Sequence, residues 1–249
     1  MPHQGQSGIY FISGGCRLLG TLFLARGDEP KPTAILLHGI PGIEKNYDLA
    51  HGLRANGWNS LIFHYRGCWG SQGQYSFETI PEDVIAALDF LCVGTFPQID
   101  TSELYLVGHS LGGWAAVIVA ARDARVRGIA TIAPIADPRE LHFTELMALQ
   151  SYTPWLSGLS PSEFVTQWHE LGKADLPIEK VCQISPRPVL IVHGRNDELV
   201  PVAQSENLFD HSLEPRELFL HDEANHSFVW HRQWLVAYIL DWLRKVSTK

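Results

Sequence analysis

The strongest chemical signal in the sequence is a serine between two glycines, in the run Gly108-His109-Ser110-Leu111-Gly112. The apolar run LYLV precedes it and predicts a strand, and the segment LGGWAAVIVAA follows and predicts a helix. A serine at a sharp strand-to-helix turn presents its hydroxyl in strained backbone geometry, and flanking glycines avoid side-chain clashes there. The helix also points its amino end at the place where negative charge would develop. This context predicts that Ser110 is a nucleophile.

A serine hydroxyl needs a base, and the base needs a carboxylate to orient it. Asp197 follows the apolar strand predicted at 188–193, in the turn where a carboxylate reaches the carboxyl edge of a parallel sheet. Glu198 and Asp222 are the rival acids, and Glu198 is better explained as a solvated loop charge. We therefore expect Asp197 to be the triad acid.

His226 is the expected base, since it lies in the loop after the short strand predicted at 217–221. His221 is its nearest rival among the 12 histidines, but it falls at the end of that strand without the freedom of a loop. The resulting chain order is Ser110, Asp197, His226, which is one of three triad orders known from unrelated folds.

Acyl transfer also requires two hydrogen-bond donors that face the oxyanion of the tetrahedral intermediate. The backbone N–H of Leu111 follows the nucleophile directly. The second donor is expected from the loop His38-Gly39-Ile40-Pro41-Gly42, which follows the strand predicted at 33–38. We assign it to the N–H of Ile40, because Pro41 has no N–H.

The candidate catalytic residues must be positioned by a fold. The pattern of the rest of the chain predicts buried strands that alternate with helices. That alternation predicts an α/β fold with a mostly parallel sheet covered by helices on both faces, and an antiparallel pair at its start. The expected strands are 8–13, 17–26, 33–38, 59–65, 104–108, 128–133, 188–193 and 217–221, and the expected helices are 45–56, 80–93, 111–121 and 229–245.

One segment of about 137–184 interrupts this alternation and predicts a cap or lid inserted into a single domain that spans residues 1–249. The segment is rich in aromatic residues, which either line a pocket or pack the insertion onto the body. The candidate substrate-pocket residues are His109, Trp69, Phe143, Trp155 and Trp168.

The runs HGIPG, GHSLGG, HGRNDELVP and ANHSF occur in the order and at the spacing of the α/β-hydrolase superfamily, which the sequence resembles over nearly its whole length. Every triad position matches, and residues 65–73 resemble the loop after the fourth strand of that family. The resemblance is greatest to small intracellular carboxylesterases with a short cap, including cinnamoyl and feruloyl esterases. The sequence also resembles the catalytic domain of prolyl oligopeptidase-like peptidases, without the propeller that many of them carry.

The composition of the chain limits the classes of partner that we expect for this protein. The 249 residues carry a formal net charge of −8 with no basic cluster, so we expect no nucleic-acid partner. No apolar run reaches about 18 residues, so no membrane span is expected, and the first residues lack the pattern of a secretion signal. His221 and His226 lie five residues apart without a zinc-binding pattern, so we expect no metal and no cofactor. We expect a cytoplasmic protein, and the sequence makes no prediction of its oligomeric state.

The sequence therefore predicts a serine hydrolase that cleaves a carboxylic ester of a small-molecule acyl substrate through an acyl-enzyme intermediate. Alternatives on the same triad are an aminopeptidase or acyl-peptide hydrolase and a thioesterase. The alternative outside enzymes is a binding module with a hydrolase fold and an inactive site.

Overall fold

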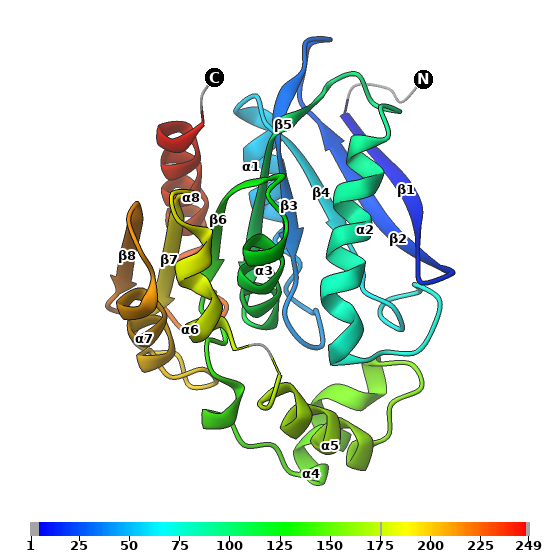
Figure 1. Ribbon diagram of the computed structural model, residues 1–249, viewed down its shortest axis with the longest axis vertical. Helices are drawn as coiled ribbons and strands as arrows, with labels where there is room; N and C mark the ends of the chain where they lie inside the picture. Colours follow the sequence, from blue (N-terminus) through cyan, green and yellow to red (C-terminus); the bar gives the residue numbers. More distant parts are fainter. Residues whose placement is uncertain (1–4, 175, 248–249) are drawn as a thin grey trace.

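An eight-stranded sheet forms the centre of the molecule (Figure 1). The computed structural model describes residues 5–174 and 176–247. The strands are β1 (Gly5–Ser13), β2 (Cys16–Leu24), β3 (Lys31–Leu37), β4 (Asn59–Phe63), β5 (Ile99–His109), β6 (Val126–Ile132), β7 (Val189–Gly194) and β8 (Arg216–His221). Their spatial order is β1-β2-β4-β3-β5-β6-β7-β8. Only β2 pairs antiparallel, with β1 and β4, so the prediction of a mostly parallel sheet with an antiparallel start is confirmed.

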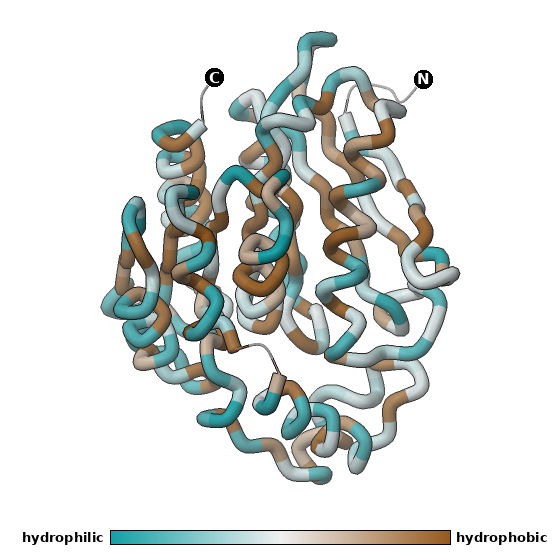
Figure 2. Tube along the Cα trace, in the orientation of Figure 1, coloured by the Kyte–Doolittle hydropathy of each residue, from teal (hydrophilic) through white to brown (hydrophobic). Residues whose placement is uncertain are grey.

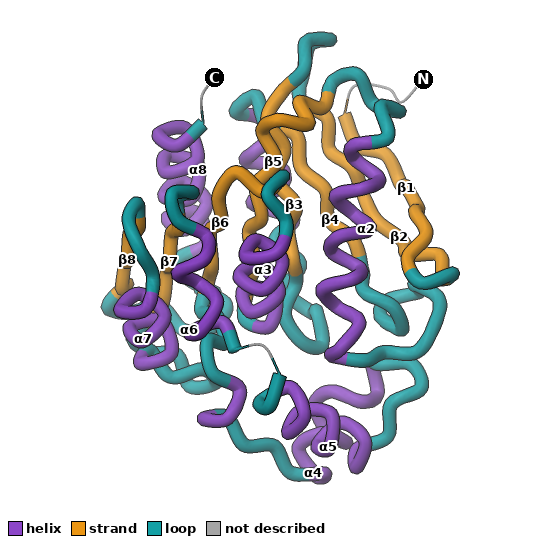
Figure 3. Tube along the Cα trace, in the orientation of Figure 1, coloured by secondary structure: helices purple, strands orange, loops and turns teal. Residues whose placement is uncertain are grey.

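Helices cover both faces of this sheet (Figure 3). They are α1 (Tyr47–Ala55), α2 (Ile80–Cys92), α3 (Leu111–Arg122), α4 (Glu145–Met147), α5 (Pro161–Leu171), α6 (Pro177–Lys180), α7 (Ala203–His211) and α8 (Arg232–Val246). Helices α1 and α8 share one apolar core with the sheet, and α2 and α3 belong to the core on its other face. Apolar segments concentrate along α3 and the strands beside it (Figure 2), as expected of a helix buried between the sheet and its neighbours.

Helix α7 was not expected from the sequence. Two of its three buried residues are polar, Gln204 and Ser205, and only Leu208 is apolar. An apolar stripe at helical spacing is the signal for such a helix, and here polar side chains stand in its place. Both are buried because each has a partner, since Gln204 bonds to the segment after β6 and Ser205 bonds to His193.

The predicted cap lies between β6 and β7, and its central part sits beyond the carboxyl edge of the sheet, at the bottom of Figure 1. It contains α4, a π-helical turn at Ala148–Tyr152, a 3-10 turn at Thr153–Trp155, and α5. Helix α5 begins with a capping box, in which Ser160 and Glu163 each accept a hydrogen bond from the other's backbone N–H. In contrast, α6 and the 3-10 turn Val181–Ile184 contact α3. The part that overhangs the sheet is therefore shorter than 137–184.

No disulfide and no membrane-crossing helix occurs within residues 5–174 and 176–247. All four cysteines are free, and Cys68 is buried. No helix in these ranges combines the length and the apolar character that a bilayer span requires.

Candidate active site

Ser110 occupies the sharp turn between β5 and α3, as the sequence predicts. Its backbone has φ 56° and ψ −119°, a region that a serine adopts only under strain. A β-carbon at Gly108 would lie 2.1 Å from the carbonyl oxygen of Gly112, and one at Gly112 would lie 2.1 Å from that of Leu37. The flanking glycines are therefore required by backbone contacts on both sides. The N–H of Ser110 donates to Ile132 O at 2.8 Å, which ties the turn to β6.

Asp197 lies in the turn after β7 and is almost fully buried. Its Oδ1 accepts the N–H groups of Leu199 and Val200, both at 2.8 Å. Its Oδ2 accepts from His226 Nδ1 at 2.7 Å. One oxygen therefore fixes the carboxylate to its own loop, and the other orients the histidine ring.

A second histidine contacts the same carboxylate, and the sequence analysis did not identify it. The Nε2 of fully buried His193 lies 3.0 Å from Asp197 Oδ2 and 3.0 Å from Val200 O. Both partners are acceptors, so Nε2 carries the proton and donates to them. Nδ1 of His193 then accepts from Ser205 Oγ at 2.6 Å. Its position four residues before Asp197, on the same strand end, was the available signal.

These contacts decide the charge of Asp197. Burial alone would raise its pKa, but the hydrogen bonds from His193 and His226 outweigh that effect and hold the pKa well below its ordinary value. Asp197 therefore remains an anion that accepts the Nδ1–H of His226 and would stabilise an imidazolium there.

His226 is held through its backbone as well as its ring. His109 Nε2 donates to the carbonyl oxygen of His226 at 2.9 Å, and the two ring centroids lie 4.7 Å apart. Burial, with a smaller effect of His226, lowers the pKa of His109 to about 3, so His109 is neutral. Among the described residues, Ser110 Oγ has no hydrogen-bond partner.

The rival residues do not take part in the hydrogen bonds between Asp197 and His226. Glu198 is exposed beside Asp197 and lines the same cavity, but it makes no hydrogen bond to His226. Asp222 is 87% exposed and pairs with Arg195. The ring of His221 packs against Trp234, with centroids 4.8 Å apart.

The loop after β3 passes directly against the nucleophile. A β-carbon at Gly39 would lie 2.9 Å from Ser110 Cβ. His38 Nδ1 donates to Gly39 O at 2.7 Å, and this fixes the peptide plane whose opposite side carries the N–H of Ile40. Within the described part of the chain, the N–H groups of Ile40 and Leu111 have no acceptor. Both are therefore free to bind an oxyanion.

A cavity of about 620 Å³ opens onto Ser110 and His226. Of the candidate pocket residues, His109 and Phe143 lie in its wall, whereas Trp69, Trp155 and Trp168 do not. The wall comprises Gly39, Ile40, Pro41, Gly42, Ile43, Glu44, His109, Ser110, Ile135, Leu141, His142, Phe143, Met147, Ser151, Tyr152, Glu198, Leu199, Val200, His226, Ser227 and Val229.

Residues 55–249 match the sequence model of the prolyl oligopeptidase family. The chain belongs to the prolyl oligopeptidase family. Among curated proteins, it is 27% identical to the uncharacterized protein YfhR of Salmonella typhimurium, over 90% of this chain and 75% of that one. It is 28% identical to the mitochondrial palmitoyl-protein thioesterase ABHD10 of Mus musculus, over 85% of this chain and 78% of that one.

Solved structures show the fold of this prolyl oligopeptidase family member. Est1E from Butyrivibrio proteoclasticus superposes with a TM-score of 0.78 at 19% identity, covering 97% of this chain and 99% of that one. The α/β hydrolase GrgF from a Penicillium species superposes with a TM-score of 0.75 at 21% identity, covering 96% and 98%. The chain has the α/β-hydrolase fold, as the sequence motifs indicated.

Trp168 of this family member packs inside the cap instead of lining the cavity. Its Nε1 donates to the carbonyl oxygens of Pro138 and Leu141, and its ring meets Phe77 and Phe143 edge to face. The side chain is almost fully buried. A large aromatic on an amphipathic helix is usually a core residue, and here it fills the interior between cap and body.

Residues 38–42 are called the oxyanion loop after the role that the sequence predicts for Ile40. Trp69 contacts this loop, and Trp155 stacks on Trp69. Their rings stack with centroids 5.4 Å apart, and Trp69 Nε1 donates to Pro41 O at 2.6 Å. Lys45 Nζ lies 3.6 Å from the centroid of Trp69. The pair therefore ties the cap to the loop that carries Ile40, on the outer side of the cavity wall.

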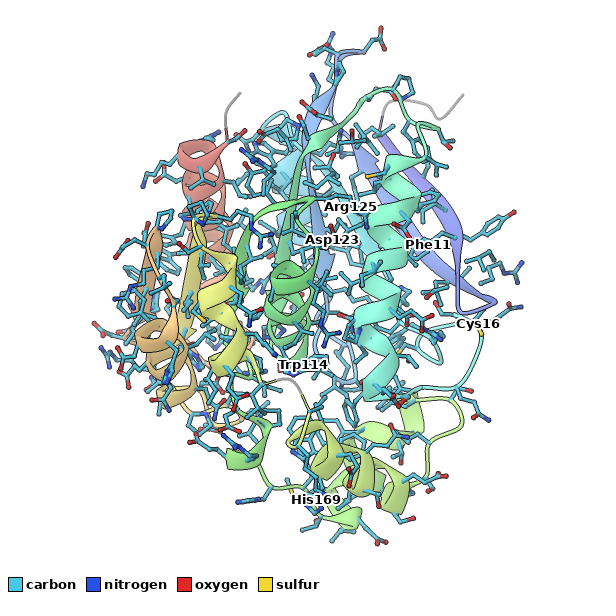
Figure 4. All side chains as sticks on the ribbon, viewed as in Figure 1. Phe11, Cys16, Trp114, Asp123, Arg125 and His169 are labelled. Atoms are coloured by element: carbon cyan, nitrogen blue, oxygen red, sulfur yellow. The ribbon has the colours of Figure 1, made fainter. Side chains whose placement is uncertain are left out.

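A second cavity, of about 760 Å³, lies between α5 and α3. Phe77, Trp114, Ile118 and Leu171 contribute to its wall, which shares no residue with the cavity at Ser110. Figure 4 shows Trp114 near the cap-facing end of α3. Ser110, Asp197 and His226 do not line this second cavity, so the candidate substrate site is the smaller cavity.

Proposed function

We propose that this chain is a serine hydrolase that cleaves carboxylic esters through an acyl-enzyme intermediate. The observation that carries the proposal is the arrangement around one cavity. Ser110 stands on a strained turn, and His226 lies in the same wall with its Nδ1 bound to the buried Asp197 carboxylate. This arrangement suits nucleophilic attack on an acyl carbonyl better than any other chemistry of these residue types.

In the proposed reaction, Ser110 Oγ attacks the carbonyl carbon while His226 Nε2 takes the hydroxyl proton. The carbonyl oxygen becomes an oxyanion that the N–H groups of Ile40 and Leu111 bind, each worth roughly 3–4 kcal/mol in the transition state. His226 returns the proton to the departing alcohol, which leaves an acyl ester on Ser110. Water, which loses a proton to His226, then attacks that ester. His226 returns this proton to Ser110 Oγ as the bond between Ser110 and the acyl group breaks, and the carboxylic acid leaves.

The cavity wall favours an ester with an apolar acyl group over a peptide. It contains the apolar side chains of Phe143, Ile135 and Leu141, and its two carboxylates are Glu44 and Glu198. A peptidase that captures a free α-amine needs carboxylates that converge on the site. The carboxylate of Glu44 already accepts a hydrogen bond from the backbone N–H of Asn46 in the same loop. Glu140 and Glu145 of the cap, the other candidates for such a role, do not line the cavity.

A thioesterase is the second candidate on the same residues. The similarity to ABHD10, a palmitoyl-protein thioesterase, and to the thiohydrolase aneE of Aspergillus aculeatus favours it. The attack on the carbonyl is the same, and only the leaving group differs.

The test compares p-nitrophenyl butyrate, a butyryl thioester and an aminoacyl anilide, each corrected for its uncatalysed rate. We expect the acceleration of the ester to exceed that of the anilide at least ~10²-fold, because an amide also needs its leaving nitrogen protonated. Ser110→Ala should lower kcat by roughly 10⁴–10⁶. A larger acceleration of the anilide would replace the proposal with a peptidase, and a larger acceleration of the thioester with a thioesterase.

A further inference from the structure

Four large apolar side chains stand exposed in the wall of the Ser110 cavity. Ile43 is 67% exposed, Met147 43%, Leu199 64% and Val229 51%. They come from four separate segments, namely the loop after β3, the cap, the loop after β7 and the loop after β8. Because they are exposed and yet line the cavity, they form its mouth, which we call the apolar rim.

The rim is continuous with the interior of the cavity. Five further apolar residues line the same cavity as Ser110 and are less exposed than the rim, namely Ile40, Ile135, Leu141, Phe143 and Val200. Trp230, next to Val229 in the chain, is a further large aromatic residue that is 89% exposed. An apolar path therefore leads from the nucleophile to the surface.

An exposed apolar surface of this kind indicates a binding site, because covering apolar side chains with a ligand removes them from water and stabilises the complex. The convergence of four segments around an opening, instead of along one flat face, indicates an occupant that enters the cavity. The net charge of −8 disfavours the anionic surface of a membrane as that occupant. The continuity with the Ser110 cavity favours a group bonded to the scissile ester.

We infer that the substrate carries an extended apolar chain of medium to long length, which runs from the ester at Ser110 along the cavity and lies against the apolar rim. The inference rests on the proposed function, because it assigns the substrate class of that same site. The volume of about 620 Å³ is in the range of sites that enclose most of a ligand of several hundred daltons. Short acyl groups such as acetyl would leave the rim uncovered.

The test measures kcat/KM for p-nitrophenyl esters from acetyl to octanoyl and for acetate esters of n-alkanols from methanol to octanol, all below their aggregation concentrations. Each buried methylene contributes up to about fourfold in kcat/KM. We expect an overall rise of at least ~30-fold along one of the two series, since the chain can belong to the acyl or to the alcohol part.

The rim is tested with the double variant Leu199→Ser/Val229→Ser. Its matched control is Leu213→Ser/Val93→Ser, which changes the same residue types at two exposed positions outside the cavity wall. We expect the rim variant to lower the long-chain to short-chain ratio of kcat/KM at least ~10-fold, and the control to keep it within about twofold of wild type.

A flat or falling dependence in both series would overturn the inference, and so would an equal ratio in rim and control variants. Loss of binding to neutral lipid vesicles in the rim variant, with the ratio unchanged, would assign the rim to a lipid surface instead. Acetyl ester turnover that depends on Ser110 would survive each of these outcomes, so the proposed function is judged separately.

Discussion

Asp197 accepts hydrogen bonds on both of its carboxylate oxygens, and these bonds have different consequences. The two on Oδ1 come from its own loop and fix the carboxylate in place. The two on Oδ2 come from His193 and His226, and they keep the group ionised although it is buried. In the proposed mechanism, only the bond to His226 selects the tautomer that leaves Nε2 free to act as a base.

Replacing Asp197 by Asn should therefore lower kcat by roughly 10⁴, because an amide nitrogen can donate to Nδ1 and favour the wrong tautomer. Steady-state kinetics on an activated ester measures the effect. Glu198→Gln is the matched control, since it removes a neighbouring carboxylate that makes no hydrogen bond to His226, and it should change kcat little. A larger loss in Glu198→Gln would mean that the acid is misassigned.

In the proposed mechanism, His38 positions the N–H of Ile40 that binds the oxyanion. Its Nδ1–H binds Gly39 O, and burial, followed by the effect of His64, lowers its pKa to about 3, so the ring stays neutral in the assay range. His38→Ala should lower kcat about 10–100-fold with a small change in KM, because the oxyanion exists only in the transition state and intermediates. His64→Gln changes the adjacent ring and should lower kcat much less. A rise in KM at constant kcat would assign His38 to substrate binding instead.

Among the elements, α2 is attached to the sheet by a buried ion pair. Asp83 on α2 accepts from Ser13 Oγ at 2.7 Å, and from Arg66 through its backbone N–H at 2.8 Å and its Nε at 2.6 Å. These bonds join β1, α2 and the loop after β4. That loop continues to Trp69, which contacts the oxyanion loop.

Asp83→Ala should reduce the free energy of unfolding by about 3–5 kcal/mol, because the largely buried guanidinium of Arg66 would lose its buried carboxylate partner. Denaturant titration measures the change. Asp89→Ala on the same helix removes an exposed partner of Arg125 and should cost at most about 1 kcal/mol. Similar losses in both variants would show that the buried pair contributes no more than a surface pair.

The strands could be predicted because buried parallel strands are continuous apolar runs, as at Ala34–Leu37 and Val189–Val192. Helix α7 could not, because its buried face is polar and depends on partners distant in the chain. Strand β5 begins at Ile99, earlier than expected. Thr101 and Ser102 interrupt its apolar pattern, so the sequence indicated only the apolar part of the strand. Local pattern therefore determines an element when its burial is apolar, and fails when hydrogen bonds replace apolar contact.

Across the whole molecule, the site residues that have a local sequence signature could be predicted, and those whose positions depend on tertiary packing could not. Ser110, Asp197 and His226 lie in turns with local signatures, and the fold brings them to one edge of the sheet. The positions of Trp69, Trp155 and Trp168 depend on how the cap packs against the body, which sequence spacing does not encode. The hydrogen bond from Ser205 to His193 likewise depends on α7, which the sequence did not reveal.

The central claim is that Ser110 is an activated nucleophile in this fold. Incubation with a fluorophosphonate, followed by intact-protein mass spectrometry and peptide mapping, tests it most directly. We expect a single covalent adduct on Ser110, none in Ser110→Ala, and loss of ester hydrolysis in proportion to labelling. Absence of an adduct on the folded protein, or an adduct on another residue that accompanies the loss of activity, would contradict it.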